Sequence, residues 1–258
     1  MKAKAFNDYI ENKLISDKKY YLFFDEIQNV DKWERIINSF KAKHGDKVSI
    51  FITGSNSDLL SGELATHIVG RYVSFNIFPF TFKEVCELKK LENKDKYSLE
   101  KEFNDFVLWG GMPQRFILNT EEEVRVYLAD VYNSIVIKDI VERFKIKALD
   151  LFNKILTYIV TTPSKTFSAE SLSNYLLSDN IEVSKATIYN YLEYMCRALL
   201  INKCDRYDVR GKRILNGKYK YYLTDLGLGQ VINNERKKQM GAYMENIVYN
   251  ELISRGYN

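Results

Sequence analysis

Seven residues near the start of the chain read Tyr20-Tyr21-Leu22-Phe23-Phe24-Asp25-Glu26. The apolar part of this stretch is too short for a helix, and charged residues flank it, so it predicts a strand buried on both faces, as in parallel sheets. Ligands of open α/β sheets bind at the carboxyl ends of the strands. The two carboxylates that follow Phe24 therefore stand where a ligand would bind.

The residues around this strand predict an α/β layer. One helix is predicted before it, over residues 3–16, and a second after it by apolar side chains at i, i+3, i+4 and i+7, namely Trp33, Ile36, Ile37 and Phe40. Residues 48–52 predict a second buried strand, which we expect to run parallel to the first. Alternating apolar side chains predict a third strand over residues 71–77. We expect residues 1–80 to form one α/β unit.

Polar side chains follow both of the predicted parallel strands. Asp25 and Glu26 can divide two tasks, one holding a magnesium ion and the other polarising an attacking water. A solvated strand-to-helix turn, in which Asp25 caps the next helix, explains the same pair equally well. The second strand ends in Thr53-Gly54-Ser55-Asn56, whose polar side chains can orient a water or contact a phosphate. Two polar strand ends side by side favour a functional site over an ordinary turn.

After residue 80 the pattern changes to helices. Residues 81–162 show helical periodicity only, and we expect them to form a helical lid. Residues 229–258 predict a linker followed by one final helix. The expected fold class is therefore α/β plus α.

Residues 163–228 predict a winged helix, since two helices capped by Ser168 and Ser184 precede two ribbon strands. Seven basic residues and two acidic ones lie between Lys203 and Lys220, so the ribbon is locally basic. Such a charge suits contacts to DNA phosphates, although winged helices also serve to pack against protein. The residues expected to contact DNA are Lys185, Asn190, Arg206, Arg210, Lys212 and Arg213.

Five motifs occur in order along the chain: Tyr20 to Gln28, Ile52 to Ser57, Gly70 to Tyr72, Pro79 to Glu84 and Gly110 to Pro113. With them the chain resembles prokaryotic AAA-type ATPases that carry a winged helix and a C-terminal restriction-endonuclease-like domain of unknown function. The resemblance continues through Lys138 to Val141 and Glu245 to Val248, and so covers nearly the whole chain.

The resemblance implies a P-loop-type parallel sheet that binds ATP and magnesium. Asp25 would hold the magnesium ion and Glu26 would be the general base, together forming the Walker B pair. The nucleotide-binding sensor region would comprise Thr53, Ser55 and Asn56. Arg71 would contact a phosphate, in its own or a neighbouring subunit, although an arginine at a strand start can equally pair with a surface carboxylate.

The phosphate-binding loop of such ATPases is absent from the sequence. That loop requires G-x-x-x-x-G-K-[ST], and the two Gly-Lys pairs, Gly211-Lys212 and Gly217-Lys218, lack this context. We therefore expect the chain to be truncated at both ends, without the P-loop and without a complete nuclease-like domain. We also expect it to bind nucleotide weakly or not at all and to have no useful turnover.

Composition narrows the class of protein. Hydrophobic residues make up 46% of the 258 residues, with only 12 Gly and 3 Pro, which excludes a disordered or collagen-like chain. No apolar run approaches the ~20 residues of a membrane-spanning helix. Three scattered cysteines and two histidines disfavour a disulfide framework and a structural zinc site. We expect a soluble cytoplasmic protein.

Three functions remain open at this point. The first is a fragment of a AAA-type ATPase that acts as a nucleotide-driven switch, the second a winged-helix DNA-binding regulator, and the third a protein-interaction scaffold whose ATPase core has lapsed. Residues 48–52 carry no charge or proline that would protect a sheet edge. We expect this edge to be covered by a second copy of the chain or by residues 1–19 folding back.

Overall fold

A computed structural model describes residues 3–14, 18–55, 72–92, 97–162, 164–208, 211, 213–232 and 240–257. The chain divides into two compact units, the N-terminal unit Met1–Asn76 and the C-terminal unit Ile77–Asn258. No described helix is both long enough and apolar enough to span a bilayer.

The N-terminal unit is a strand–helix–strand arrangement preceded by a helix. Its elements are α1 (Ala3–Glu11), β1 (Tyr20–Phe24), the 3-10 turn η1 (Ile27–Asn29), α2 (Trp33–His44), the 3-10 turn η2 (Gly45–Lys47) and β2 (Val48–Ile52). β1 and β2 are parallel, and Phe24 stands opposite Ile52. The predicted strands, their parallel pairing and the helix between them are confirmed.

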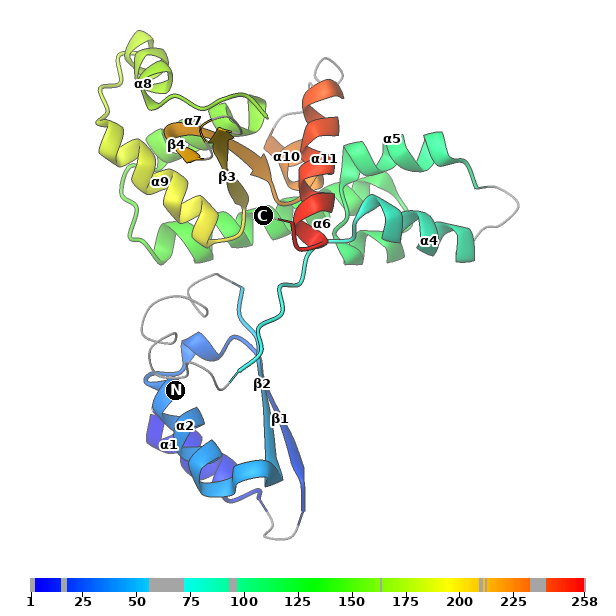
Figure 1. Cartoon of the computed structure of the whole chain (residues 1–258), viewed down its shortest axis with the longest axis vertical. Coiled ribbons are helices and arrows are strands. Elements are labelled where there is room, and N and C mark those ends of the chain that lie inside the picture. Colours follow the sequence, from blue (N-terminus) through cyan, green and yellow to red (C-terminus); the bar gives the residue numbers. More distant parts are fainter. Residues whose placement is uncertain are drawn as a thin grey trace. The chain divides into compact units, whose positions relative to one another are not determined.

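Helices cover one face of this sheet. All four apolar residues that predicted α2 are buried, and α1 adds Phe6, whose ring centroid lies 5.2 Å from that of Phe24. Figure 1 shows α1 and α2 together on one side of β1 and β2. Lys43 Nζ donates a hydrogen bond of 2.7 Å to Glu11 Oε2, which ties the two helices together.

The prediction that β1 is buried on both faces is wrong. Tyr21 and Phe23 are 58% and 73% exposed, and Phe51 on β2 is 48% exposed. A parallel sheet is buried on both faces only where helices cover both. The described helices of this unit pack on the same side, so Tyr21, Phe23 and Phe51 form an open apolar face, on which the rings of Phe23 and Phe51 stack at 4.7 Å.

The predicted third strand over residues 71–77 is also not found. Residues 72–77 are in no strand, and Val73, Phe75 and Ile77 are 78%, 79% and 90% exposed. Alternating apolar side chains form a strand only where a neighbour supplies hydrogen bonds, and in the described part of the chain the sheet of β1 has two strands. Arg71 itself lies outside the described residues.

The C-terminal unit is helical with one β-ribbon. Its elements are α4 (Phe82–Glu92), α5 (Leu99–Trp109), the 3-10 segment η4 (Pro113–Ile117), α6 (Glu121–Ser134), the π-helix η5 (Ile135–Glu142), α7 (Leu149–Thr161), α8 (Ala169–Ser178), α9 (Lys185–Arg197), β3 (Ile201–Asp208), β4 (Arg213–Leu223), α10 (Leu226–Ile232) and α11 (Met240–Ser254). The predicted helices and ribbon are present. The π-helix and α10 were not predicted.

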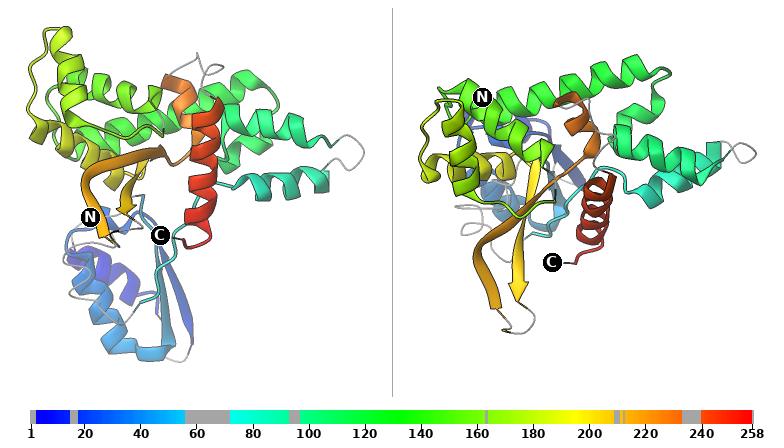
Figure 2. Two further views of the ribbon diagram at one scale, coloured as in Figure 1. Left: turned by 45° about the horizontal axis from the view of Figure 1, so that its top comes forward. Right: turned by 90° about the horizontal axis from the view of Figure 1, so that it is seen from above.

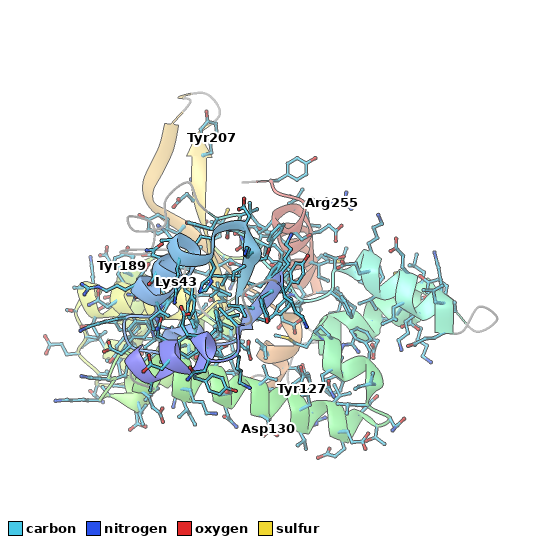
Figure 3. All side chains as sticks on the ribbon, turned by 90° about the horizontal axis from the view of Figure 1, so that it is seen from below. Lys43, Tyr127, Asp130, Tyr189, Tyr207 and Arg255 are labelled. Carbon is cyan, nitrogen blue, oxygen red and sulfur yellow. The ribbon has the colours of Figure 1, made fainter. Side chains whose placement is uncertain are left out.

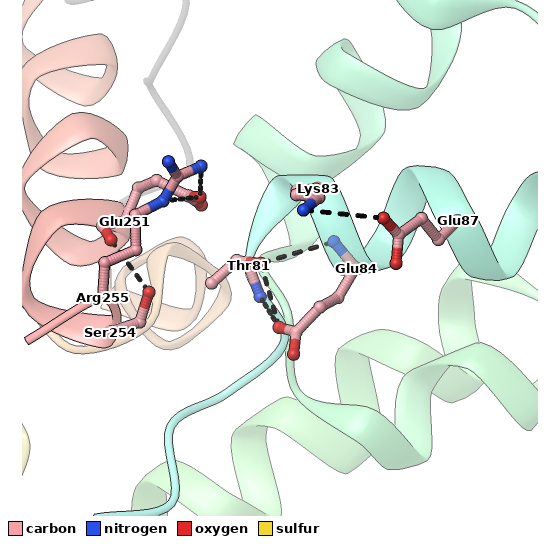
Figure 4. A network of polar contacts seen from close by, with 7 residues as sticks. All are labelled: Thr81, Lys83, Glu84, Glu87, Glu251, Ser254 and Arg255. Atoms are coloured by element: carbon pink, nitrogen blue, oxygen red, sulfur yellow. Dashed lines mark hydrogen bonds and ion pairs between the residues drawn. The ribbon is translucent and has the colours of Figure 1, made fainter.

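Local capping explains where several of these helices begin. Ser168 and Ser184 accept hydrogen bonds from Ser171 N and Thr187 N, as predicted. Thr81 and Glu84 form a reciprocal pair at the start of α4, which Figure 4 shows in close view. Such pairs satisfy amides that a helix leaves without intrahelical partners.

α8, α9 and the antiparallel ribbon share one core. Leu172 and Leu176 of α8 and Ile188, Leu192 and Met195 of α9 are buried in it. Beyond this core the ribbon of β3 and β4 extends past the helices (Figure 2). The structure therefore gives the predicted order of elements, helix, helix, ribbon.

A buried carboxylate explains the Gly110-Gly111 motif. Asp225 accepts hydrogen bonds from Gly111 N at 2.6 Å and Gly227 N at 2.7 Å. Phe80 N in turn donates to Gly111 O at 2.8 Å. A Cβ on Gly111 would lie 2.0 Å from Phe80 O, so only glycine fits. Asp225 thus joins the start of the C-terminal unit to α5 and α10.

Candidate functional site

The carboxyl ends of β1 and β2 bring four of the predicted site residues together. Thr53 Oγ1 donates a hydrogen bond to Asp25 Oδ1, and Ser55 Oγ donates one of 3.1 Å to Glu26 Oε2. The backbone continues the pairing of the strands at this point, because Thr53 N donates to Phe24 O at 2.9 Å. The end of β1 therefore supplies two carboxylates and the end of β2 supplies the two hydroxyls that pair with them.

Glu26 adopts an unusual backbone conformation. Its φ of 50° and ψ of 44° are left-handed, and it precedes η1. For a residue with a Cβ this conformation costs about 1–2 kcal/mol, and such outliers cluster where geometry serves function. The turn directs the Glu26 carboxylate back toward Ser55 at the end of β2.

Gln28 is a neighbour of Glu26 whose role the sequence motifs do not predict. Gln28 Nε2 donates a hydrogen bond to Glu26 Oε2, while Gln28 Oε1 is buried and has no hydrogen-bond partner among the described residues. One carboxylate oxygen of Glu26 thus accepts from both Gln28 and Ser55. In the sequence, Gln28 stands two positions after Glu26, and this spacing alone does not predict a hydrogen bond between the two side chains.

The donor set of this site fits a magnesium ion held together with a phosphate. Asp25 and Thr53 are exposed and present carboxylate and hydroxyl oxygens, the ligands that Mg²⁺ prefers, and Mg²⁺ is usually bound through one or two carboxylates plus substrate phosphates. The described residues contain no group of three His, Cys, Asp or Glu side chains able to hold a metal ion alone. Asp25 would hold a magnesium ion only in company with the nucleotide.

Several predicted site residues are not placed by the structure. Asn56, Arg71, Arg210 and Lys212 lie outside the described residues, and Arg213 is described only through its backbone at the start of β4. Their predicted roles stay predictions.

In the described part of the predicted DNA surface, three lysines lie close to carboxylates. Lys185 Nζ lies 3.6 Å from Glu170, Lys203 lies 3.3 Å from Asp205, and Lys220 lies 2.6 Å from Glu245. Asn190 and Arg206 are exposed. Tyr207 stands near the outer end of the ribbon and Tyr189 on α9 (Figure 3), whereas Tyr191 and Tyr194 pack against the core.

A family model and a solved structure are similar to parts of this chain. Residues 1–86 match the model of a family described as an AAA domain. A Walker-type ATPase of Pyrococcus abyssi has a similar fold, with a TM-score of 0.55 and 15% identity over 89% of this chain and 66% of that one. At this identity the likeness speaks for the fold alone.

Relatives in other organisms are longer than this chain. An uncharacterized protein of Haemophilus influenzae is 33% identical over 99% of this chain and 63% of its own length. An uncharacterized protein of Methanocaldococcus jannaschii is 33% identical over 92% of this chain and 53% of its own length. The chain thus spans between half and two thirds of these relatives. Residues 100–239 match a further family model, and because this match covers more than half of the 258 residues, the chain belongs to the family described as a domain of unknown function, DUF8612.

Proposed function

We propose that the N-terminal unit carries those residues of a AAA-type ATP site that act in hydrolysis, and that it works as a nucleotide-driven switch. The observation that carries this proposal is the pairing of Thr53 with Asp25 and of Ser55 with Glu26 across two parallel strand ends. The match of residues 1–86 to an AAA domain supports it. So does the Walker-type ATPase with a similar fold.

Each residue has a distinct role in this proposal. A magnesium ion, when bound with the nucleotide, neutralises phosphate charge, and Asp25 and Thr53 are the residues that would hold it. Glu26 accepts a proton from the attacking water as general base. Ser55 and Gln28 fix the position of the Glu26 carboxylate through their hydrogen bonds. Asn56 and Arg71 would contact the nucleotide from outside the described residues.

The 258 residues alone are proposed not to hydrolyse ATP. Their sequence holds no G-x-x-x-x-G-K-[ST], the loop whose backbone amides and lysine bind the phosphates. Calorimetric titration of the chain with ATP and magnesium tests this part, and we expect a dissociation constant above about 1 mM. Micromolar binding would contradict it. Asp25→Asn is the matched variant, since it removes the proposed magnesium ligand and keeps the size of the side chain.

We further propose that α8, α9 and the ribbon are a winged helix. The order of elements and the shared core of Leu172, Ile188 and Leu192 support this assignment. Binding of DNA through Arg206, Asn190 and the ribbon tip would appear as affinity that falls steeply with added salt. If no such binding occurs and a stable complex with another protein forms, the scaffold role is favoured.

A further inference from the structure

A small cavity lies within the C-terminal unit, where α11 approaches the segment that leads into α4. Its volume is about 30 Å³, which is room for about two atoms the size of a water oxygen. Residues 78–82 and α11 both line it, and Figure 4 shows three of the lining residues, Thr81 before α4 and Glu251 and Ser254 on α11. α5, β3, α10 and the link between β4 and α10 supply the rest of the lining.

Two of the lining residues carry a buried polar atom that has no hydrogen-bond partner among the described residues, Thr224 Oγ1 and Asn250 Oδ1. Asn250 Nδ2 donates to Leu223 O and to Thr224 O, both at 3.0 Å. The amide cannot be turned round, because Oδ1 would then face these two carbonyl oxygens. Buried polar atoms nearly always have a partner, and leaving one without a partner costs stability. Since both atoms can accept a hydrogen bond, a ligand that donates would satisfy them.

The charged residues of the lining are acidic. Asp225 and Glu251 belong to it, and none of the lining residues is Lys, Arg or His. Arg255 donates twice to Glu251 Oε1, from Nε at 2.8 Å and from Nη2 at 2.5 Å, whereas Glu251 Oε2 accepts from no donor in the described part of the chain. The side chain of Arg255 is 56% exposed and that of Glu251 23%. This lining disfavours a phosphate or carboxylate as ligand and favours a cation.

Aromatic residues make up much of the apolar lining. Four phenylalanines contribute to it, Phe78, Phe80, Phe82 and Phe106, and the ring centroids of Phe82 and Phe106 are 5.4 Å apart. Aromatic rings attract cations, most strongly where water is excluded. Hard metal ions take oxygen ligands on all sides, whereas an organic cation also has an apolar part that suits such rings. The lining therefore favours an organic cation over a metal ion.

We propose that this cavity binds a primary ammonium group, carried either by a small free amine or by a lysine side chain. An ammonium group has three hydrogen-bond donors and no acceptor, and the cavity offers three acceptors, Thr224 Oγ1, Asn250 Oδ1 and Glu251 Oε2. The nitrogen and the carbon bound to it are two atoms, which matches the volume of the cavity. The proposal concerns the C-terminal unit alone, so it can be tested apart from the ATP site.

The test is a titration of the 258-residue chain with methylammonium chloride, followed through the NMR signal of the Asn250 side-chain amide. We expect a shift that saturates with a Kd of about 10 mM, because a ligand of two heavy atoms can bind only weakly. Methanol controls for size and potassium chloride for charge, and neither should give a saturating shift.

A second ligand identifies the source of the ammonium group. Tighter binding of N-acetyl-lysine amide than of methylammonium would assign the cavity to a lysine side chain of a protein. Weaker binding would assign it to a free small amine. Either result supports a site for a primary ammonium group.

Two variants test the assigned acceptors. Thr224→Val removes the hydroxyl and keeps the shape, and because this hydroxyl has no partner among the described residues, the variant should keep its thermal stability while its Kd rises at least about fivefold. Glu251→Gln should raise the Kd by a similar factor. Glu87→Gln is the matched control, since Glu87 is an exposed acid on α4 outside the lining, and it should leave the Kd unchanged.

Three results would overturn the proposal. If methylammonium gives no saturating shift at concentrations well above the expected Kd, the cavity holds water alone. If potassium binds as tightly as methylammonium, the site is one for a metal cation. If Thr224→Val and Glu251→Gln both leave the Kd unchanged, the ammonium group binds elsewhere on the chain.

Discussion

Ser55 Oγ lies 3.1 Å from Glu26 Oε2 and donates a hydrogen bond to it, although 29 positions separate the two residues. The contact exists because β1 and β2 are parallel and end side by side. It places a hydroxyl beside the carboxylate that we propose as general base. The chemistry proposed for this chain depends on that juxtaposition.

The left-handed backbone of Glu26 gives a first prediction. Glu26→Ala and Glu26→Gly both lose the hydrogen bonds from Ser55 and Gln28, and they differ in the backbone. Glycine adopts positive φ without the steric cost that alanine meets, so Glu26→Gly should be more stable by about 1 kcal/mol. Urea denaturation of the two variants measures the difference. Equal stability would mean that residue 26 is not left-handed in solution.

The close packing around Asp225, which accepts hydrogen bonds from Gly111 N and Gly227 N, gives a second prediction. In Gly111→Ala the new Cβ would meet the carbonyl oxygen of Phe80 at 2.0 Å, a backbone atom that cannot turn away. We expect a loss of about 1–3 kcal/mol or more. Gly241→Ala on α11 is the control, because no described atom outside its own stretch of helix lies within 4 Å of the new Cβ, and it should be neutral or slightly stabilising. Thermal denaturation compares the two, and equal effects would contradict the packing described.

Stability toward acid gives a third prediction, through Glu245. Burial raises the pKa of Glu245, but hydrogen bonds from Lys220 and Tyr222 outweigh burial, and the net pKa lies below its ordinary value. A lowered pKa in the folded state stabilises the fold above the unfolded pKa, and this contribution is lost as pH falls through the folded value.

Glu245→Gln should therefore be less stable than wild type near neutral pH, with a difference that shrinks below about pH 4.5. Denaturant unfolding at several pH values measures the difference. Glu193→Gln, on the exposed side of α9, controls for loss of a surface charge. A Glu245→Gln difference that stays constant down to pH 3 would contradict the network of Lys220, Tyr222 and Glu245.

Local patterns were sufficient to predict most elements. The spacing of Trp33, Ile36, Ile37 and Phe40 predicted α2 because one face of that helix is buried. The apolar runs of β1 and β2 had the length of strands, and strands joined by a helix run parallel. Their parallel pairing also brought Asp25 close to Thr53, so this part of the site could be derived from topology.

Other features depend on contacts that local patterns do not contain. Residues 72–77 alternate as a strand would, but a strand needs a neighbour that the described sheet does not supply. α10 was missed because Gly227 and Gly229 disfavour helix, whereas Gly227 is needed where its Cα approaches Trp109 O. Likewise, Gln28 could not be assigned to Glu26 without the left-handed turn between them.

The most direct test of the proposed ATP site is hydrolysis by this chain joined at its N-terminus to a segment carrying a strand and G-x-x-x-x-G-K-[ST]. In that protein Glu26→Gln should keep ATP binding, because the amide preserves the shape of the side chain. Its rate of hydrolysis should fall by about 10²–10⁴-fold, because the amide cannot accept the proton of the attacking water. Glu34→Gln on α2 is the control and should leave turnover unchanged. Unchanged turnover in Glu26→Gln would contradict the account.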